Sequence, residues 1–224
     1  MRKYPKDTEF IIDSGAFSVW NTGGTVDRVK LLEFYRVIKK AFPHSHFINL
    51  DSIPGKKGQK PSKAEVKRAC EESWDNYMFF KANNFEVLPV FHEDDEWEYL
   101  HKMMAETDYI AISPANDSSV KRRMKWLDRV YSILKADYKT HGLAATSIQL
   151  LKRYPFYSVD FINWKTALLY GRMISGSIPQ KQTGQIARTP HGKRLILRRE
   201  IKHFVQLEKD ITHLWAKRGI VWKD

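Results

Sequence analysis

The stretch FIIDSGAFSVW, residues 10–20, joins an apolar run to a carboxylate and then to a turn of small residues. A short apolar run bounded by polar residues and glycine predicts a buried β-strand, here residues 9–14. Asp13 then stands at the carboxyl end of this strand. An aspartate at a strand end is often only the cap of the next helix. Its role therefore depends on whether the pattern recurs elsewhere in the chain.

The pattern recurs, because strand-like segments alternate with segments of helical periodicity. Such alternation predicts parallel strands joined by helical crossovers. The number of units favours a lean (β/α) barrel of the TIM type over residues 1–170, since an eight-unit barrel typically uses about 250 residues; a doubly wound open sheet is the alternative. Residues 171–224 are predicted to complete the same domain. The predicted strands are 9–14, 46–52, 86–92, 108–114, 140–145 and 156–164, the helices between them are 26–42, 62–84, 94–106, 117–136 and 146–155, and a basic loop (171–194) leads into a terminal helix (195–219).

Composition indicates a globular protein with a polyanionic partner. The 224 residues carry a formal net charge of +12, and the last 60 residues hold 13 Lys and Arg against 4 Asp and Glu. This bias is typical of a nucleic-acid-binding surface, although a basic tail helix without a ligand would have the same composition. No segment approaches the roughly 18 apolar residues of a membrane span, and the charged N-terminus lacks the apolar core of a signal peptide. We therefore expect a cytoplasmic protein without a membrane partner.

Polar residues stand at the ends of the predicted strands. Asp13, Asp51 and His92 end the first three, His141 lies in the fifth, and Asp160 lies near the end of the sixth. In a parallel barrel these ends form one rim, so the side chains would converge on one pocket. Two convergent carboxylates suit glycosyl chemistry, in which one attacks or stabilises an anomeric carbon and the other moves a proton. Metal ligation by the same residue types is the competing chemistry.

The sequence gives no specific sign of a metal or another cofactor, and none is predicted. No HExxH or similar spaced ligand motif is present. The single cysteine, Cys70, excludes an intrachain disulfide and any multi-cysteine zinc site, and its helix-like surroundings indicate a packing role.

Several motifs, taken in order, resemble those of the tRNA-guanine transglycosylases. DSGAFS at 13–18 resembles the DSGGFQ motif of that family. The resemblance covers roughly residues 8–170 and implies a (β/α) barrel that exchanges guanine in nucleic acid for a 7-deazaguanine through a covalent aspartyl-glycosyl intermediate. The segments that follow in the family's order are FINLDSIPG (47–55), LPVFH (88–92), DYIAISP (108–114) and THGLAATSIQLLKRYPFYSVDFINW (140–164).

The resemblance also implies roles for individual residues. Asp13 corresponds to the general acid/base and Asp160 to the nucleophile, with Asn163 as the other alignment for the nucleophile's position. Asp51 corresponds to the residue that binds the Watson–Crick edge of the base, a task that suits a carboxylate acceptor. Further residues expected at the base are Ser14, Gly15, Phe17, His92, His141 and Gly142, and those expected to hold the phosphate backbone are Lys181, Arg188, Lys193, Arg194, Arg198 and Arg199.

The chain departs from the family pattern at several positions. Ala16 and Ser18 replace a glycine and a glutamine, and His92 replaces a glutamine that reads the base. With Cys70 alone, the chain lacks the family's zinc subdomain. A smaller, zinc-free and basic relative resembles the DNA-modifying, phage-type branch, so DNA is favoured over tRNA, in the host cytoplasm if a phage encodes the chain. Base exchange on tRNA, a small-molecule barrel enzyme for an acidic or phosphorylated substrate, and a non-catalytic nucleic-acid-binding barrel are the alternatives. The incoming base and the oligomeric state stay open.

Overall fold

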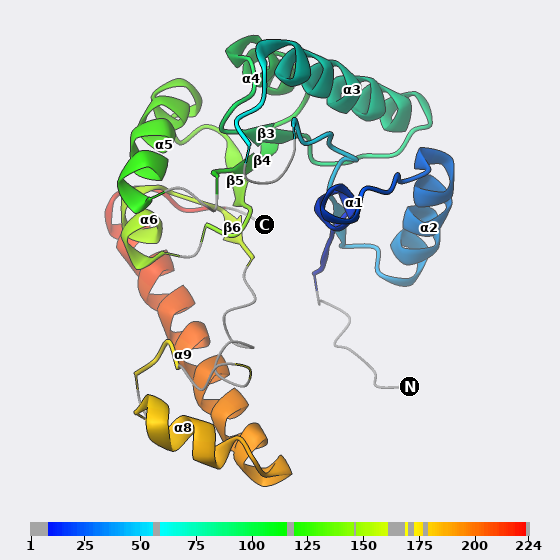
Figure 1. Cartoon of the computed structure of the whole chain (residues 1–224). Coiled ribbons are helices and arrows are strands. Elements are labelled where there is room, and N and C mark those ends of the chain that lie inside the picture. The colour runs from blue at the N-terminus through cyan, green and yellow to red at the C-terminus, as the bar shows by residue number, and fades with distance from the viewer. Residues whose placement is uncertain are drawn as a thin grey trace.

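The computed structural model describes residues 9–55, 59–115, 119–145, 147–160, 169, 173–176 and 179–222. In this part of the chain strands alternate with helices, which confirms the mixed α/β prediction (Figure 1). The strands are β1 (Ile11–Ile12), β2 (His46–Phe47), β3 (Val90–His92), β4 (Tyr109–Ser113), β5 (Lys139–Gly142) and β6 (Ser158–Val159). The helices are α1 (Ala16–Thr22), α2 (Arg28–Ala41), α3 (Lys63–Ala82), α4 (Trp97–Glu106), α5 (Val120–Leu134), α6 (Ile148–Arg153), α8 (Gln180–Ile186) and α9 (Pro190–Lys217).

The six described strands are parallel, and their order in space follows their order in the chain. β1 pairs with β2, and β3, β4, β5 and β6 form a second ladder in that order. A parallel bridge between Ile48 and Leu88 connects the two ladders. The described order contains no reversal, whereas a doubly wound sheet reverses at its switch point. No ladder joins β6 to β1 among the described residues, so these residues do not close a barrel.

The two faces of the sheet pack against different partners. Side chains alternate between the faces of a strand, and Phe91, Ile110 and Ile112 on one face pack with Leu100 of α4 and Leu127 of α5. Figure 1 shows α2 to α6 following one another along the outer side of the strands. On the other face, the described cluster consists of residues within or next to strands. These are the buried Ile48, Leu88, Val90, Tyr109 and Ala111, with the partly buried Ile11, Leu143 and Tyr157.

Side-chain caps fix where several helices begin. Asp27 accepts hydrogen bonds from the first backbone N–H groups of α2, and Ser62 and Glu65 form a capping box at the start of α3. Ser119 caps α5 by accepting from the backbone of Arg122. These caps satisfy helix-end N–H groups that would otherwise lack partners.

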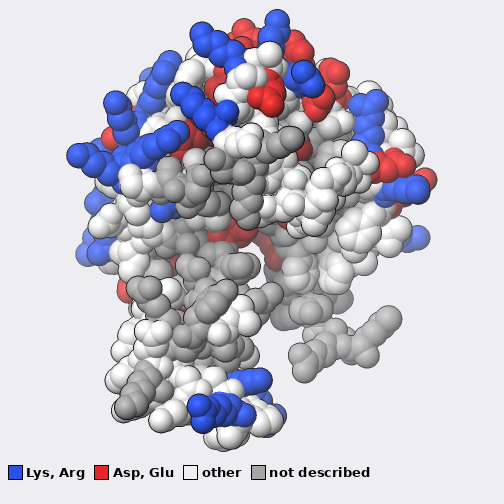
Figure 2. Space-filling model, viewed as in Figure 1, with Lys and Arg blue, Asp and Glu red and all other residues white. Residues whose placement is uncertain are grey.

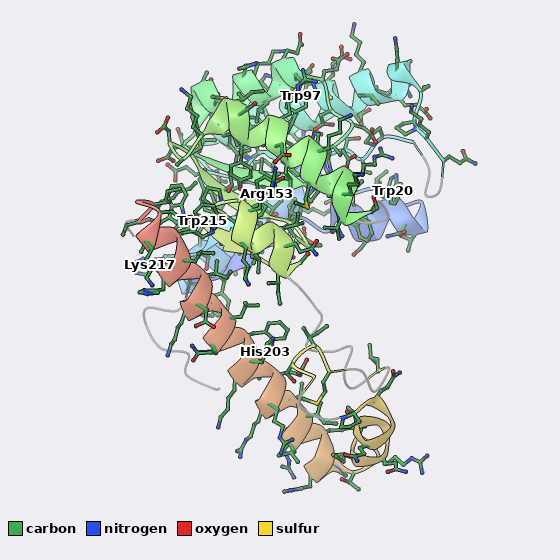
Figure 3. The ribbon with its side chains drawn as sticks, turned by 90° about the vertical axis from the view of Figure 1, so that its left-hand side faces the viewer. Trp20, Trp97, Arg153, His203, Trp215 and Lys217 are labelled. Atoms are coloured by element: carbon green, nitrogen blue, oxygen red, sulfur yellow. The ribbon has the colours of Figure 1, made fainter. Side chains whose placement is uncertain are left out.

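Helices α8 and α9 form a C-terminal extension. The end of α9 docks on α6, where Trp215 Nε1 donates to the Leu151 carbonyl at 2.9 Å. Residues 180–203, which we call the C-terminal arm, extend away from the strands (Figures 1 and 3). Inside the arm, the buried Glu200 accepts from the backbone N–H groups of Ile174 and Ser175. A small apolar cluster supports the arm and consists of Met173, Ile186, Ala187 and Ile196.

Three details of the predicted elements are wrong. The described strands are shorter than predicted, because the paired backbone covers only two to five residues in each strand. The small-residue turn after Asp13 leads at once into α1, which the sequence did not indicate. The predicted loop 171–194 contains α8 and the start of α9. Within the described part of the chain, every helix is either too short or too polar to span a bilayer.

Candidate functional site

Four predicted site residues from separate strand ends gather at one edge of the sheet. Asp13 directly follows β1, His92 ends β3, and Asp160 directly follows β6. Asp51, which follows β2, hydrogen-bonds to His92. The carboxyl group of Asp13 lies in the electrostatic field of both Asp51 and Asp160. Figure 2 shows acidic side chains inside the hollow at the centre of the view.

Asp13 is a carboxyl group whose protonated form is favoured. Burial of the carboxyl is the largest effect and raises its pKa. The negative charges of Asp51 and Asp160 raise the pKa further. Hydrogen bonds from the backbone of Gly15 and Ser14 act in the opposite direction, yet the net shift is upward. An aspartate with a raised pKa is a better proton donor to a leaving group than one that is already ionised at low pH.

Asp51 and His92 form a buried ion pair. Asp51 Oδ2 lies 2.8 Å from His92 Nε2, and the two side chains are only 9% and 14% exposed. Burial alone would lower the pKa of His92. The hydrogen bond to Asp51 and the negative charges of Asp95, Asp51 and Asp94 outweigh it and raise the pKa of His92 to about 9. His92 is therefore cationic at neutral pH.

A second layer of polar contacts fixes this pair. Asp95 Oδ2 accepts from the backbone N–H of His92 at 2.8 Å, and Asp95 Oδ1 accepts from the Cys70 thiol at 3.5 Å. Burial, followed by the charge of Asp95, raises the pKa of Cys70 to about 12. Cys70 thus stays a neutral thiol packed in the core, which confirms the predicted packing role.

Asp160 sits at the mouth of a buried polar chain. Its side chain is 58% exposed, and its Oδ1 accepts from the backbone N–H of Ala144 at 2.7 Å. His141 Nε2 lies 3.8 Å from this oxygen and has no hydrogen-bond partner among the described residues. His141 Nδ1 and the Tyr109 hydroxyl each lie 2.7 Å from Ser158 Oγ. Burial lowers the pKa of His141, so the imidazole faces Asp160 as a neutral ring.

The residues after Asp13 have mainly structural contacts. Ser14 is buried, and its hydroxyl accepts from the Ala16 backbone N–H at the start of α1. Gly15 adopts a left-handed conformation, with φ 80°, that favours glycine. Phe17 is 57% exposed, with its ring 5.9 Å from that of Trp20. The exposed Phe17 ring is therefore accessible to a ligand, whereas the Ser14 hydroxyl is already hydrogen-bonded at the start of α1.

Gly142 is required for packing inside the protein. A methyl group at this position would lie 2.8 Å from Ala145 Cβ and 2.9 Å from the ring of Phe156. These distances are shorter than ordinary contacts between carbon atoms. The absence of a side chain at Gly142 is thus explained without any contact to a bound base.

The structure does not bring the predicted backbone-binding residues to the carboxylates. They lie on the C-terminal arm, which Figure 3 shows below the body of the protein. Lys181 belongs to α8, and its side chain lies outside the described residues, as does Asn163, the alternative position for the nucleophile. The exposed members of the set are Arg188, Lys193, Arg194, Arg198 and Arg199.

Sequence reasoning missed the residues that support the site. Ser158 stands two residues before Asp160, so both lie on one face of the strand, a signal that could have linked them. Tyr35 donates from its hydroxyl to the Ile48 carbonyl at 2.8 Å, and nothing in its helical sequence context indicates this. The negative charges of Asp13 and Asp51 add to burial in raising the pKa of Tyr35.

The described residues contain no group of three or more His, Cys, Asp or Glu side chains placed to hold a metal ion. No model of a known protein family and no curated protein sequence matches this chain. The site is therefore interpreted from its own geometry.

Proposed function

We propose that this chain is a nucleic-acid guanine transglycosylase of the DNA-modifying type, which exchanges a guanine in DNA for a 7-deazaguanine. The observation that carries the proposal is the meeting of Asp13, Asp51 and Asp160 at one edge of the sheet. The three carboxylates have different surroundings. Asp13 has a raised pKa, Asp51 is paired with His92, and Asp160 is exposed. Such differences allow acid, binding and nucleophilic roles to be divided among them.

We also infer that the strands belong to a lean (β/α) barrel. The strictly sequential order of parallel strands supports this architecture. The apolar cluster on the face away from the helices extends from Ile11 beside β2 to Tyr157 beside β5, as expected for the interior of a curved sheet. The rings of His46, Tyr109 and Tyr157 make successive edge contacts with centroids 5.3 Å apart. These residues come from the second, fourth and sixth strand units, and barrel interiors are layered by alternate strands in this way.

In the proposed reaction, an Asp160 carboxylate oxygen attacks C1′ of the target nucleotide. The C1′–N9 bond breaks, its electron pair leaves with the guanine, and protonated Asp13 supplies the proton that neutralises the leaving base. The incoming 7-deazaguanine gives its N9 proton to the Asp13 carboxylate, and its N9 attacks C1′ and releases Asp160. Two displacements at the same carbon retain the anomeric configuration. In duplex DNA the target nucleotide must first leave the stack.

The Asp51–His92 pair suits the edge of a guanine-like base. Asp51 uses Oδ2 for His92, which leaves Oδ1 to accept from N–H donors of the base. His92 stands in the position where the resembling family has glutamine. Its Nε2–H is used for Asp51, so in the proposed complex the Nδ1–H of the cationic ring is the donor left for a carbonyl oxygen of the base. These interactions favour a base with adjacent carbonyl and N–H groups over adenine.

The test is incorporation of labelled guanine into either duplex DNA or tRNA by the purified chain, with a denaturing gel for the covalent adduct. We expect exchange into DNA, and loss of both exchange and adduct in Asp160→Asn. Asp137→Asn, an exposed aspartate outside the site, is the matched control. Normal exchange by Asp160→Asn would disprove the assigned nucleophile. Exchange into tRNA alone would change the substrate, and binding without exchange into either polymer would contradict the transglycosylase proposal.

A further inference from the structure

A basic groove separate from the C-terminal arm lies between α5 and α6. We call it the α5–α6 groove, and its volume is about 620 Å³. Figure 3 looks onto these two helices and places Arg153 between them, and Figure 2 shows basic side chains gathered on this side of the molecule. Its lining residues are Ser119, Lys121, Arg122, Met124, Lys125, Asp128, Gln149 and Arg153.

The charges of the groove are only partly balanced within the protein. Arg153 pairs with both oxygens of Asp128, at 2.8 and 2.9 Å, so these two groups neutralise each other. Lys121 and Lys125 are exposed and have no hydrogen bond or ion pair with any residue that the structure describes. Because they are four residues apart on α5, their ammonium groups share one helix face and repel each other. An anion in the groove would relieve that repulsion.

A salt bridge ties the groove to the candidate active site. Arg122 Nε donates to Glu93 Oε1 at 2.8 Å, and the Glu93 side chain is 8% exposed. Glu93 directly follows His92, the partner of Asp51, and its Oε2 accepts from the backbone N–H of Ala115. The groove is thus connected through β3 to the residue assigned to the base. The first turns of α5 lie at the carboxyl end of the sheet, because α5 is the next element in the chain after β4.

We propose that the α5–α6 groove binds the sugar–phosphate backbone beside the nucleotide that reaches Asp51 and His92; the role of that strand as substrate rests on the proposed function. Lysines act on phosphates as point charges and carry no sequence information. The lining includes no aromatic ring on which a base could stack. The groove therefore recognises phosphodiester charge, which DNA and RNA share.

The experiment compares Lys121→Ala/Lys125→Ala with the unsubstituted chain in binding a fluorescein-labelled DNA duplex over a range of salt concentrations. Loss of two phosphate contacts is expected to reduce the slope of log K against log salt by roughly 1.8 and to weaken binding about tenfold at low salt. The control, Lys40→Ala/Lys135→Ala, removes the same charge at exposed positions at the carboxyl ends of α2 and α5, away from the site. The control should keep the original slope. Lys125→Glu reverses the charge at one of the two positions, so it should weaken binding more than Lys125→Ala does, while its circular dichroism spectrum stays unchanged.

The outcomes separate this inference from the proposed function. If the double variant and the control have the same affinity and slope on both DNA and a tRNA transcript, the groove does not bind nucleic acid. If binding depends on the groove but the unmodified chain exchanges no base, the groove assignment stands and the transglycosylase proposal falls. If only the tRNA transcript responds, the groove binds RNA rather than DNA. Binding to anionic lipid vesicles with no groove-dependent binding to either nucleic acid would also overturn the inference.

Discussion

His92 Nε2 and Asp51 Oδ2 lie 2.8 Å apart, so the end of the third strand holds the carboxylate that follows the second. The pair is largely buried, and the carboxylate of Asp95 accepts a hydrogen bond from the backbone N–H of His92. Removing one partner of a buried pair leaves an uncompensated charge, which is strongly destabilising. The pair therefore contributes to the stability of the fold, and under the proposed function it would also contact the base.

The first prediction concerns stability against pH. The pKa of His92 rises from 6.5 in the unfolded chain to about 9 in the folded one. Its contribution is complete below pH 6.5 and is lost as pH rises through 9. The free energy of unfolding from urea titration should fall by roughly 3 kcal/mol across that interval. In His92→Gln this slope should be absent. An equal slope in both proteins would show that another group titrates there.

The second prediction concerns the carboxyl group of Asp13. Asp51 contributes to its raised pKa, so Asp51→Asn removes one like charge and should lower that pKa toward the ordinary value. Burial is the larger cause, so part of the upward shift should remain. Carbon-detected NMR titration of the aspartate carboxyl groups measures the shift directly. Asp75→Asn, an exposed change on α3, is the control. An Asp13 titration that does not move would contradict the electrostatic coupling.

The third prediction uses two glycines with different surroundings. Gly142→Ala forces a methyl group into Ala145 and Phe156, so it should destabilise the protein by about 1–3 kcal/mol. Gly184→Ala lies in α8, and no atom beyond its chain neighbours and the backbone of its own helix lies within 4 Å of the added carbon, so it should be neutral or stabilise by up to about 1 kcal/mol. Thermal unfolding of both variants gives the comparison. Similar behaviour of the two would mean that the close packing around Gly142 relaxes freely.

Periodic segments made most of the fold predictable from the sequence. The helix after Asp27 and the one capped by Ser62 both combine a cap with an apolar face, and both occur where predicted. Helix α8 reads QKQTGQI and has almost no apolar periodicity. It depends on Ile186 packing against Met173 and Ile196, a tertiary contact that a local pattern does not contain. The packing of Ile186, rather than the helix propensity of the local sequence, therefore stabilises α8.

The same limit applies to the site. Asp13, Asp51 and Asp160 were predictable because each ends an apolar strand, and parallel strands bring such ends together. The salt bridge between Glu93 and Arg122 joins residues 29 positions apart and needs the register of β3 and the start of α5. The net charge along the sequence indicated the C-terminal residues as the nucleic-acid-binding surface. The α5–α6 groove could not be found in this way, because its basic side chains come from two helices that only the fold brings together.

The fourth prediction concerns Glu200 in the C-terminal arm. Its two carboxylate oxygens accept from Ile174 N–H at 2.9 Å and Ser175 N–H at 3.2 Å, and the side chain is fully buried. Glu200→Gln replaces one acceptor by a donor, so one N–H group loses its partner at a cost of about 1–3 kcal/mol. Limited proteolysis should therefore cut the arm faster. Glu208→Gln, an exposed change on the same helix, should be cut at the original rate.

The last prediction concerns the buried chain behind Asp160. Ser158→Ala leaves both His141 Nδ1 and the Tyr109 hydroxyl without their partner, and each lies 2.7 Å from Ser158 Oγ. Unfolding in urea should show a loss of about 2 kcal/mol, because buried polar groups without hydrogen bonds are costly. Adding Tyr109→Phe removes one of the two unpaired groups, so the double variant should lose less than the sum of the single variants. Strict additivity would mean that the two hydrogen bonds are independent, and no loss in Ser158→Ala would mean that water replaces the serine hydroxyl.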